Sequence, residues 1–136
     1  MSLGYDLENA ANPWRYMQVE ELRDLVISVL EDMKALDVRV LDVRDKTSIT
    51  DYFIIASGTS DRHVKSTAEA VAFQAKQAGE APLGAEGVRD GEWALIDLNG
   101  IVVHVMQAKV RDFYQLERLW SVDVAAAEKL SKQGPS

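Results

Sequence analysis

The stretch from Asp51 to Val64 most strongly constrains the fold, because it combines a strand, a tight turn and the start of a helix. Residues 52–56 are aromatic, β-branched or small and none is charged, which favours a central strand covered on both faces. Ser57-Gly58-Thr59 then breaks the run. Ser60 can cap a helix that begins at Asp61, whose carboxylate suits the positive end of the helix dipole.

A junction of this kind also occurs in phosphate-binding sites, where backbone N–H groups converge at a helix N-terminus. This turn has one glycine, whereas a P-loop needs Gly-x-x-x-x-Gly-Lys-Ser/Thr and a dinucleotide fingerprint needs three spaced glycines. Asp61 also stands where an anion would bind. Capping is therefore the favoured interpretation, and phosphate binding is the alternative.

Length and composition favour one domain without disulfides or metals. The chain has 136 residues, no cysteine and two histidines far apart in sequence, which makes a disulfide framework, a thiolate nucleophile and a zinc site improbable. No run approaches the roughly 20 apolar residues of a membrane span, and the N-terminus lacks the pattern of a signal or transit peptide. We therefore expect a cytoplasmic protein.

The net charge of −7 argues against nucleic-acid binding as the main source of affinity, because such binding depends on Lys and Arg that neutralise phosphates. Two interpretations stay open: acidity that only maintains solubility, and a basic protein partner.

Periodicity predicts the elements around this junction. Apolar residues spaced three or four apart predict an amphipathic helix: Leu22, Leu25, Val26, Val29, Leu30, Met33 and Leu36. Residues 38–43 alternate like a strand that can form an antiparallel hairpin with 52–56. The helix after Ser60 should stop at Gly79, and residues 83–88 allow one short edge strand.

A second strong signal is Asn99-Gly100 between two strand-like runs, 92–98 and 101–106. This pair suits a type I′ turn and predicts a β-hairpin in which Leu98 faces Ile101 and Leu95 faces His104. One face is then aliphatic, and we expect helices to cover it: Ala94, Ile96, Leu98, Ile101, Val103 and Val105. The opposite surface is chemically mixed, and we call it the hairpin face: Trp93, Leu95, Asp97, Val102, His104 and Met106.

The hairpin face is the candidate functional surface. Two interpretations of it are open. In the first it is partly exposed and contacts a partner. In the second a further helix covers it and His104 is hydrogen-bonded to Asp97 as a diagonal cross-strand pair. A nearby segment, 112–120, is rich in Tyr and Trp, which anchor protein interfaces as well as cores.

Several motifs in a fixed order carry a resemblance to a known family. They are Thr47-Ser48-Ile49-Thr50 leading into 51–60, Arg62-His63-Val64, Gly91-Glu92-Trp93, Val102-Val103-His104-Val105-Met106, and 114–120, together with Gly87 and Asp97. The chain resembles the ribosomal silencing factor family, also called Iojap-like, over roughly 19–120. The resemblance implies an α/β (α+β) fold, a mixed sheet of about five strands with flanking helices, related to nucleotidyltransferases.

The resemblance also implies a function and a domain layout. Family members bind the fourteenth protein of the large ribosomal subunit and sterically block joining of the small subunit, which represses translation when nutrients are short. Dimers are frequent among them, and contact with nucleic acid is not expected beyond neighbouring rRNA. Carried over by position, the partner-binding residues are Trp93, Asp97, His104, Tyr114, Leu119 and Trp120. We expect one domain over 17–122, an irregular arm at 1–16 and a tail at 123–136.

The alternative function is a metal-dependent, nucleotidyltransferase-like enzyme. Such a site needs a Gly-Ser turn and carboxylates that hold two divalent metals. Gly58 and Ser60 match the turn, but the candidate metal strand, 95–99, has Asp97 as its one carboxylate. The sequence therefore favours a binding protein with no catalytic, cofactor-binding or metal-binding residues.

Overall fold

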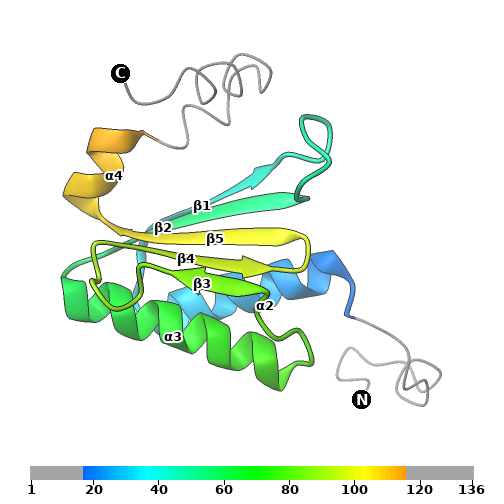
Figure 1. The fold of residues 1–136 in the computed structure, drawn as a ribbon, viewed down its shortest axis with the longest axis horizontal. Helices are drawn as coiled ribbons and strands as arrows, with labels where there is room; N and C mark the ends of the chain where they lie inside the picture. Colours follow the sequence, from blue (N-terminus) through cyan, green and yellow to red (C-terminus); the bar gives the residue numbers. More distant parts are fainter. Residues whose placement is uncertain (1–16, 116–136) are drawn as a thin grey trace.

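A five-stranded mixed sheet organises the fold, in a computed structural model that describes residues 17–115 (Figure 1). The strand order is β1-β2-β5-β4-β3. The strands are β1 (Leu36–Asp42), β2 (Tyr52–Gly58), β3 (Gly84–Glu86), β4 (Trp93–Leu98) and β5 (Ile101–Gln107). β2 and β5 pair in parallel and the other neighbours are antiparallel. The predicted fold class is confirmed, and the relation to nucleotidyltransferases stays a prediction.

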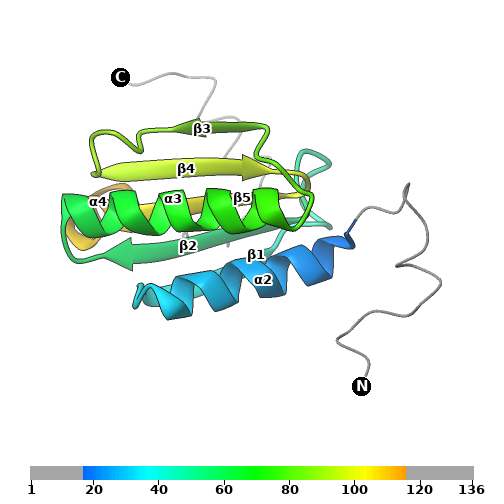
Figure 2. The same cartoon turned by 90° about the horizontal axis from the view of Figure 1, so that it is seen from below.

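The helices lie on both sides of this sheet. α2 (Val19–Asp32) and α3 (Asp61–Gln77) lie side by side on one face (Figure 2), and α4 (Ala108–Tyr114) lies on the other side. The predicted aliphatic face of the hairpin is buried in the core beneath α2 and α3, as expected. The small residues Ala68, Val71 and Ala75 on α3 are all buried in this core, which brings the helix axis close to the strands.

The junction after β2 has the predicted form. Every residue of β2 is buried, and the Ser60 hydroxyl accepts a hydrogen bond from the backbone N–H of His63 at 3.0 Å. α3 ends at Gln77, and Gly79 follows with φ +90°, the left-handed conformation that favours glycine after a helix. The capping interpretation is therefore confirmed.

The predicted hairpin is confirmed in its register as well as its position. Leu98 pairs with Ile101 and Leu95 pairs with His104. Gly100 has φ +88°, but Asn99 is not among the residues with positive φ. The predicted type I′ turn is therefore wrong, because that turn needs positive φ at both central residues.

The first helix is shorter than its apolar period suggested. α2 ends at Asp32, and Lys34 adopts a left-handed φ of 61° that reverses the chain. The backbone N–H of Ala35 donates to the Leu30 carbonyl at 2.9 Å and closes this turn. Leu36 therefore opens β1, with 51% of its surface exposed, and its assignment to the helix stripe was wrong.

The described residues cover most of the predicted domain, 17–122. The predicted arm at 1–16, the tail at 123–136 and the segment 116–122 lie outside them, so these boundaries stay predictions.

Candidate functional site

The hairpin face divides into a half-buried part and a buried part. Trp93, Leu95 and Asp97 on β4 and Val102 on β5 are half-buried, whereas His104 and Met106 on β5 are buried. The accessible part therefore follows β4 toward the short edge strand β3. The partial exposure expected for this face is correct for β4, but the exposure expected for His104 is wrong, since only 5% of its surface is accessible.

His104 is buried because β5 is an interior strand. Its neighbour β2 places Phe53 beside it, with ring centroids 4.4 Å apart. Phe53, Ile55, Met106 and Val43 form a second apolar cluster on this side of the sheet, against which Trp93, Val102 and Val110 of α4 pack. The prediction that a further helix covers this face holds at one end, where α4 lies.

The partner of the His104 ring is Trp93 rather than the expected Asp97. The indole Nε1–H of Trp93 donates a hydrogen bond to Nδ1 of His104 at 2.8 Å, and the two ring centroids lie 5.8 Å apart. An acceptor Nδ1 carries no proton, so the imidazole is neutral with its proton on Nε2. Burial acts in the same direction, because desolvation lowers the pKa of His104 to about 4.

A hollow of about 340 Å³ lies beside Trp93 and is lined by Glu86, Gly87, Trp93 and Leu95. Glu86 pairs with Leu95 across β3 and β4, so both side chains lie on the hairpin face. Gly87 has φ +73°, and a Cβ there would collide with the carbonyl oxygen of Trp93. Only glycine fits at this position, because the backbone of Gly87 passes close to the backbone of Trp93.

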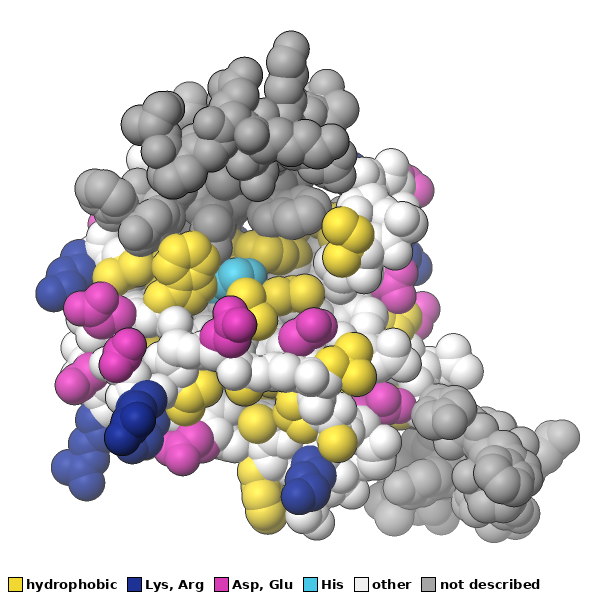
Figure 3. All heavy atoms as spheres, in the orientation of Figure 1, with side chains coloured by type: hydrophobic (Ala, Val, Ile, Leu, Met, Phe, Trp, Pro, Cys, Tyr) yellow, Lys and Arg dark blue, Asp and Glu magenta, His cyan; other side chains and the backbone are white. Residues whose placement is uncertain are grey.

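Glu86 lines this hollow, and further acidic residues lie near it in the sequence. Residues 84–98 contain four acidic residues and one basic residue, and Figure 3 shows acidic side chains beside the hydrophobic ones near β3 and β4. Glu86 and Asp97 form no ion pair within residues 17–115. On β1, by contrast, Asp42 is paired with Arg44 at 2.6 Å. The surface around Trp93 therefore has negative charge that the described chain does not neutralise.

Glu86 and Gly87 were not among the predicted site residues. The signal that could have identified them was the short edge strand predicted at 83–88, because an edge strand beside β4 must extend the hairpin face.

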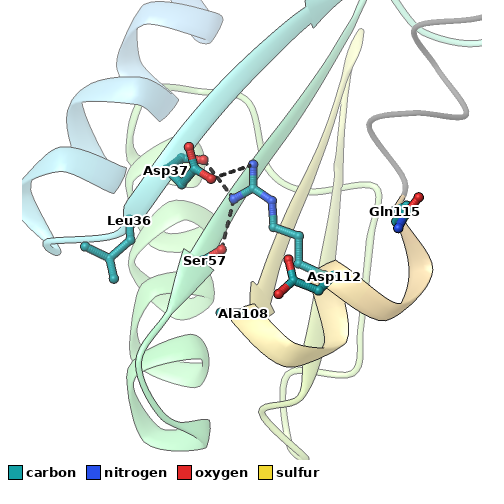
Figure 4. Close-up of a pocket in the computed structure, with 7 residues that line it drawn as sticks. Leu36, Asp37, Ser57, Ala108, Asp112 and Gln115 are labelled. Atoms are coloured by element: carbon teal, nitrogen blue, oxygen red, sulfur yellow. Dashed lines mark hydrogen bonds and ion pairs between the residues drawn. The ribbon is translucent and has the colours of Figure 1, made fainter.

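A second hollow, of about 560 Å³, lies where α4 meets β1 and β2 (Figure 4). Arg111 is 4% exposed. Its Nη1 donates to the backbone carbonyl of Asp37 at 2.7 Å and to the Ser57 hydroxyl at 2.9 Å. Its Nη2 lies 3.8 Å from the Asp37 carboxylate. These bonds tie α4 to two strands, so Arg111 has a structural role that sequence reasoning missed.

The other predicted partner-binding residues are only partly located. Tyr114 is the last residue of α4, and nothing is described of its side chain. Leu119 and Trp120 lie outside the described residues.

His63 belongs to the family motif, and its hydrogen bonds give it a structural role. Its Nδ1 accepts from the Thr59 backbone N–H at 2.9 Å, so Nε2 carries the proton and donates to the Met33 carbonyl at 2.7 Å. The ring thereby joins the start of α3 to the end of α2.

Within residues 17–115, no group of three or more His, Cys, Asp or Glu side chains could hold a metal ion. None of the helices described there has the length and apolarity needed to cross a membrane.

Comparison with known proteins agrees with this architecture. A family model described as "Ribosomal silencing factor during starvation" matches residues 16–135. The chain is 43% identical over 104 residues to ribosomal silencing factor RsfS of Chromobacterium violaceum, across 76% of this chain and 85% of that protein. It is 31% identical over 102 residues to mouse "mitochondrial assembly of ribosomal large subunit protein 1", across 73% of this chain and 45% of that protein.

A solved structure shows the same fold. The crystal structure of a Chromobacterium violaceum protein superposes with a TM-score of 0.76 at 43% identity, covering 77% of this chain and 88% of that one. The family model spans most of the sequence, and the sheet that carries the hairpin face has the same architecture in the solved structure. The chain therefore belongs to the ribosomal silencing factor family.

Proposed function

We propose that this protein docks on the large ribosomal subunit through the hairpin face and the hollow beside it, on the fourteenth large-subunit protein, and sterically blocks joining of the small subunit. The observation that carries the proposal is a half-buried tryptophan beside an apolar hollow, on the side of the sheet that α2 and α3 leave uncovered. Aromatic side chains in such positions are frequent anchors of protein interfaces.

The inhibitory effect would come from occupied volume, so the mechanism requires no reaction. A rigid domain bound where the two subunits meet prevents their approach for as long as it stays bound. The protein would then repress translation under nutrient limitation, act in the cytoplasm and need no cofactor. The residues two positions on either side of Asp97 are Leu95 and Asn99, so this strand lacks the second carboxylate of a two-metal site.

Partner selectivity would come from charge around the apolar anchor. Glu86 on β3 lies opposite Leu95, and Asp97 lies two residues beyond Leu95 on β4. Glu86 and Asp97 are therefore a diagonal pair, and opposed or diagonal pairs on a sheet lie within roughly 4.5–8 Å. Lys or Arg side chains of the partner would complement both carboxylates, which speeds association and disfavours acidic partners.

Truncation of the anchor tests this proposal. Trp93→Ala should weaken binding to purified large subunits by about 2–4 kcal/mol, or roughly 30- to 1000-fold, while the protein stays folded because the indole is only half-buried. Co-sedimentation on sucrose gradients measures the change. Phe73→Ala is the matched control, since Phe73 is an aromatic residue of α3 that is 57% exposed on the opposite side of the sheet.

The proposal fails if folded Trp93→Ala co-sediments with large subunits as well as the wild type does. Comigration of the wild type with small subunits instead of large ones would also contradict it.

A further inference from the structure

His104 offers little surface to a partner, because only 5% of its surface is exposed. Its ring is nevertheless a polar group in an apolar cluster, between Phe53 on β2 and Trp93 on β4. A hydrocarbon side chain of similar volume would fill the same space without the cost of burying a polar group. A polar ring at this position therefore indicates an interaction with a neighbouring polar group.

One neighbour is both half-buried and hydrogen-bonded to His104. The Trp93 indole has two side-chain torsions, and from β4 it could lie over the hollow or turn away from it. The hydrogen bond of 2.8 Å from Nε1–H to Nδ1 ties the indole to His104 on the interior strand β5. The remaining ring surface then lines the hollow together with Leu95, Glu86 and Gly87.

His104 is itself held in place from the other side. Its ring lies against Phe53 at an interplanar angle of 34°, and Phe53 is 4% exposed. Three rings from three adjacent strands thus form a continuous row: Phe53 on β2, His104 on β5 and Trp93 on β4. The interior of the sheet fixes the imidazole, and the imidazole fixes the indole.

The acceptor at Nδ1 requires a neutral ring, and the apolar surroundings keep it neutral. Burial lowers the pKa of His104 to about 4, so Nδ1 can accept the hydrogen bond from the indole N–H throughout the physiological range. Asp97, which the sequence suggested as the partner of this ring, is left available on the surface.

We infer that His104 is a positioning residue for docking, a buried acceptor that holds the Trp93 indole in its binding orientation and makes no contact with the partner itself. The inference rests on the proposed function. It predicts that loss of the hydrogen bond weakens binding, because a free indole must be ordered at the moment of docking.

A double-mutant cycle tests the inference. His104→Leu removes the acceptor at similar volume, and Trp93→Phe removes the donor and keeps an aromatic ring. Each folded single variant should bind purified large subunits about tenfold more weakly than the wild type, and the double variant should be no weaker than the weaker single variant. His104→Asn should restore most of the affinity, because its Oδ1 can take the place of Nδ1 as acceptor.

A spectroscopic readout separates this role from simple stabilisation. The chain has three tryptophans, and the indole N–H resonance that disappears in Trp93→Phe identifies Trp93. This resonance should shift in folded His104→Leu and return toward its wild-type position in His104→Asn. Trp93→Phe breaks the same hydrogen bond with His104 in place, so the test survives if His104→Leu does not fold.

The possible outcomes distinguish the two ideas. If Trp93→Ala loses binding but folded His104→Leu binds like the wild type, or if the two single losses multiply in the double variant, the positioning role is wrong and the docking proposal stands. If Trp93→Ala itself binds normally, the docking proposal is wrong.

Discussion

At the scale of single residues, the chemistry of this protein depends on which polar side chains the fold covers. His104 and Asp97 are both titratable residues of the hairpin face, yet His104 is buried and Asp97 is half-buried. The difference comes from the strand that carries each of them. β5 is flanked by β2 and β4, whereas the neighbour of β4 toward the edge is a strand of three residues.

The pKa of His104 predicts how stability changes with pH. The unfolded chain protonates this ring near pH 6.5 and the folded chain only near pH 4, so between these values the unfolded state binds more protons. The contribution of the neutral His104 ring to the free energy of unfolding is present above pH 6.5 and is lost as the pH falls toward 4. The free energy of unfolding should fall by about 2 kcal/mol between pH 7.5 and pH 5.

Urea unfolding at several pH values measures this change. His104→Leu is the control, because it removes the titrating ring and should flatten the curve between pH 7.5 and pH 5. An equal decline in both proteins would assign the pH dependence to other groups.

At the scale of elements, local sequence signals determine where most helices and strands begin and end. The β4–β5 hairpin follows from Asn99-Gly100, and the start of α3 follows from Ser60. Where no such signal exists, periodicity alone gives the wrong boundary. The apolar stripe of α2 continues in sequence to Leu36, but the helix ends at Asp32 because Lys34 takes a left-handed conformation. Non-glycine residues adopt this conformation infrequently, so a lysine in the sequence does not predict it.

The cap of α3 gives a prediction at this scale. Ser60→Ala removes the acceptor for the His63 N–H and should lower the free energy of unfolding by about 1 kcal/mol. Ser66→Ala is the control, since Ser66 is an exposed residue inside the same helix, where alanine is the better helix former. Thermal or urea unfolding of both variants measures the difference, and equal stabilities would exclude the cap as a significant contribution.

At the scale of the whole molecule, charge is distributed unevenly over the sheet. Arginines neutralise the carboxylates of Asp24, Asp37 and Asp42, whereas the acidic residues around the hollow have no such partner among residues 17–115. If the hairpin face docks on a basic surface, attraction between the two should depend on salt, because salt screens exposed charges.

A charge reversal separates local from global effects. Asp97→Lys should bind large subunits roughly three- to thirtyfold more weakly at low salt, since it replaces an attraction with a repulsion. Glu69→Lys changes the net charge by the same amount on exposed α3, away from the hairpin face, and should have little effect. Affinities measured between low and moderate salt should converge, and equal losses in the two variants would indicate that only net charge matters.

The sequence by itself determined the elements that rest on local interactions: the interior strand at 52–56, the cap at Ser60, the hairpin register and the division of the hairpin into an aliphatic and a mixed face. The position of a turn, helix capping and the alternation of a strand act between residues close in the chain, so they can be predicted from neighbours. The tertiary structure alone decided that β5 lies parallel to β2, because this pairing joins strands separated by α3, β3 and β4. That pairing places Phe53 against His104 and buries the imidazole, whose hydrogen-bond partner Trp93 comes from β4, the other strand of the hairpin. The hollow and the site of Arg111 have the same origin, since each is formed by segments that meet only when the chain is folded.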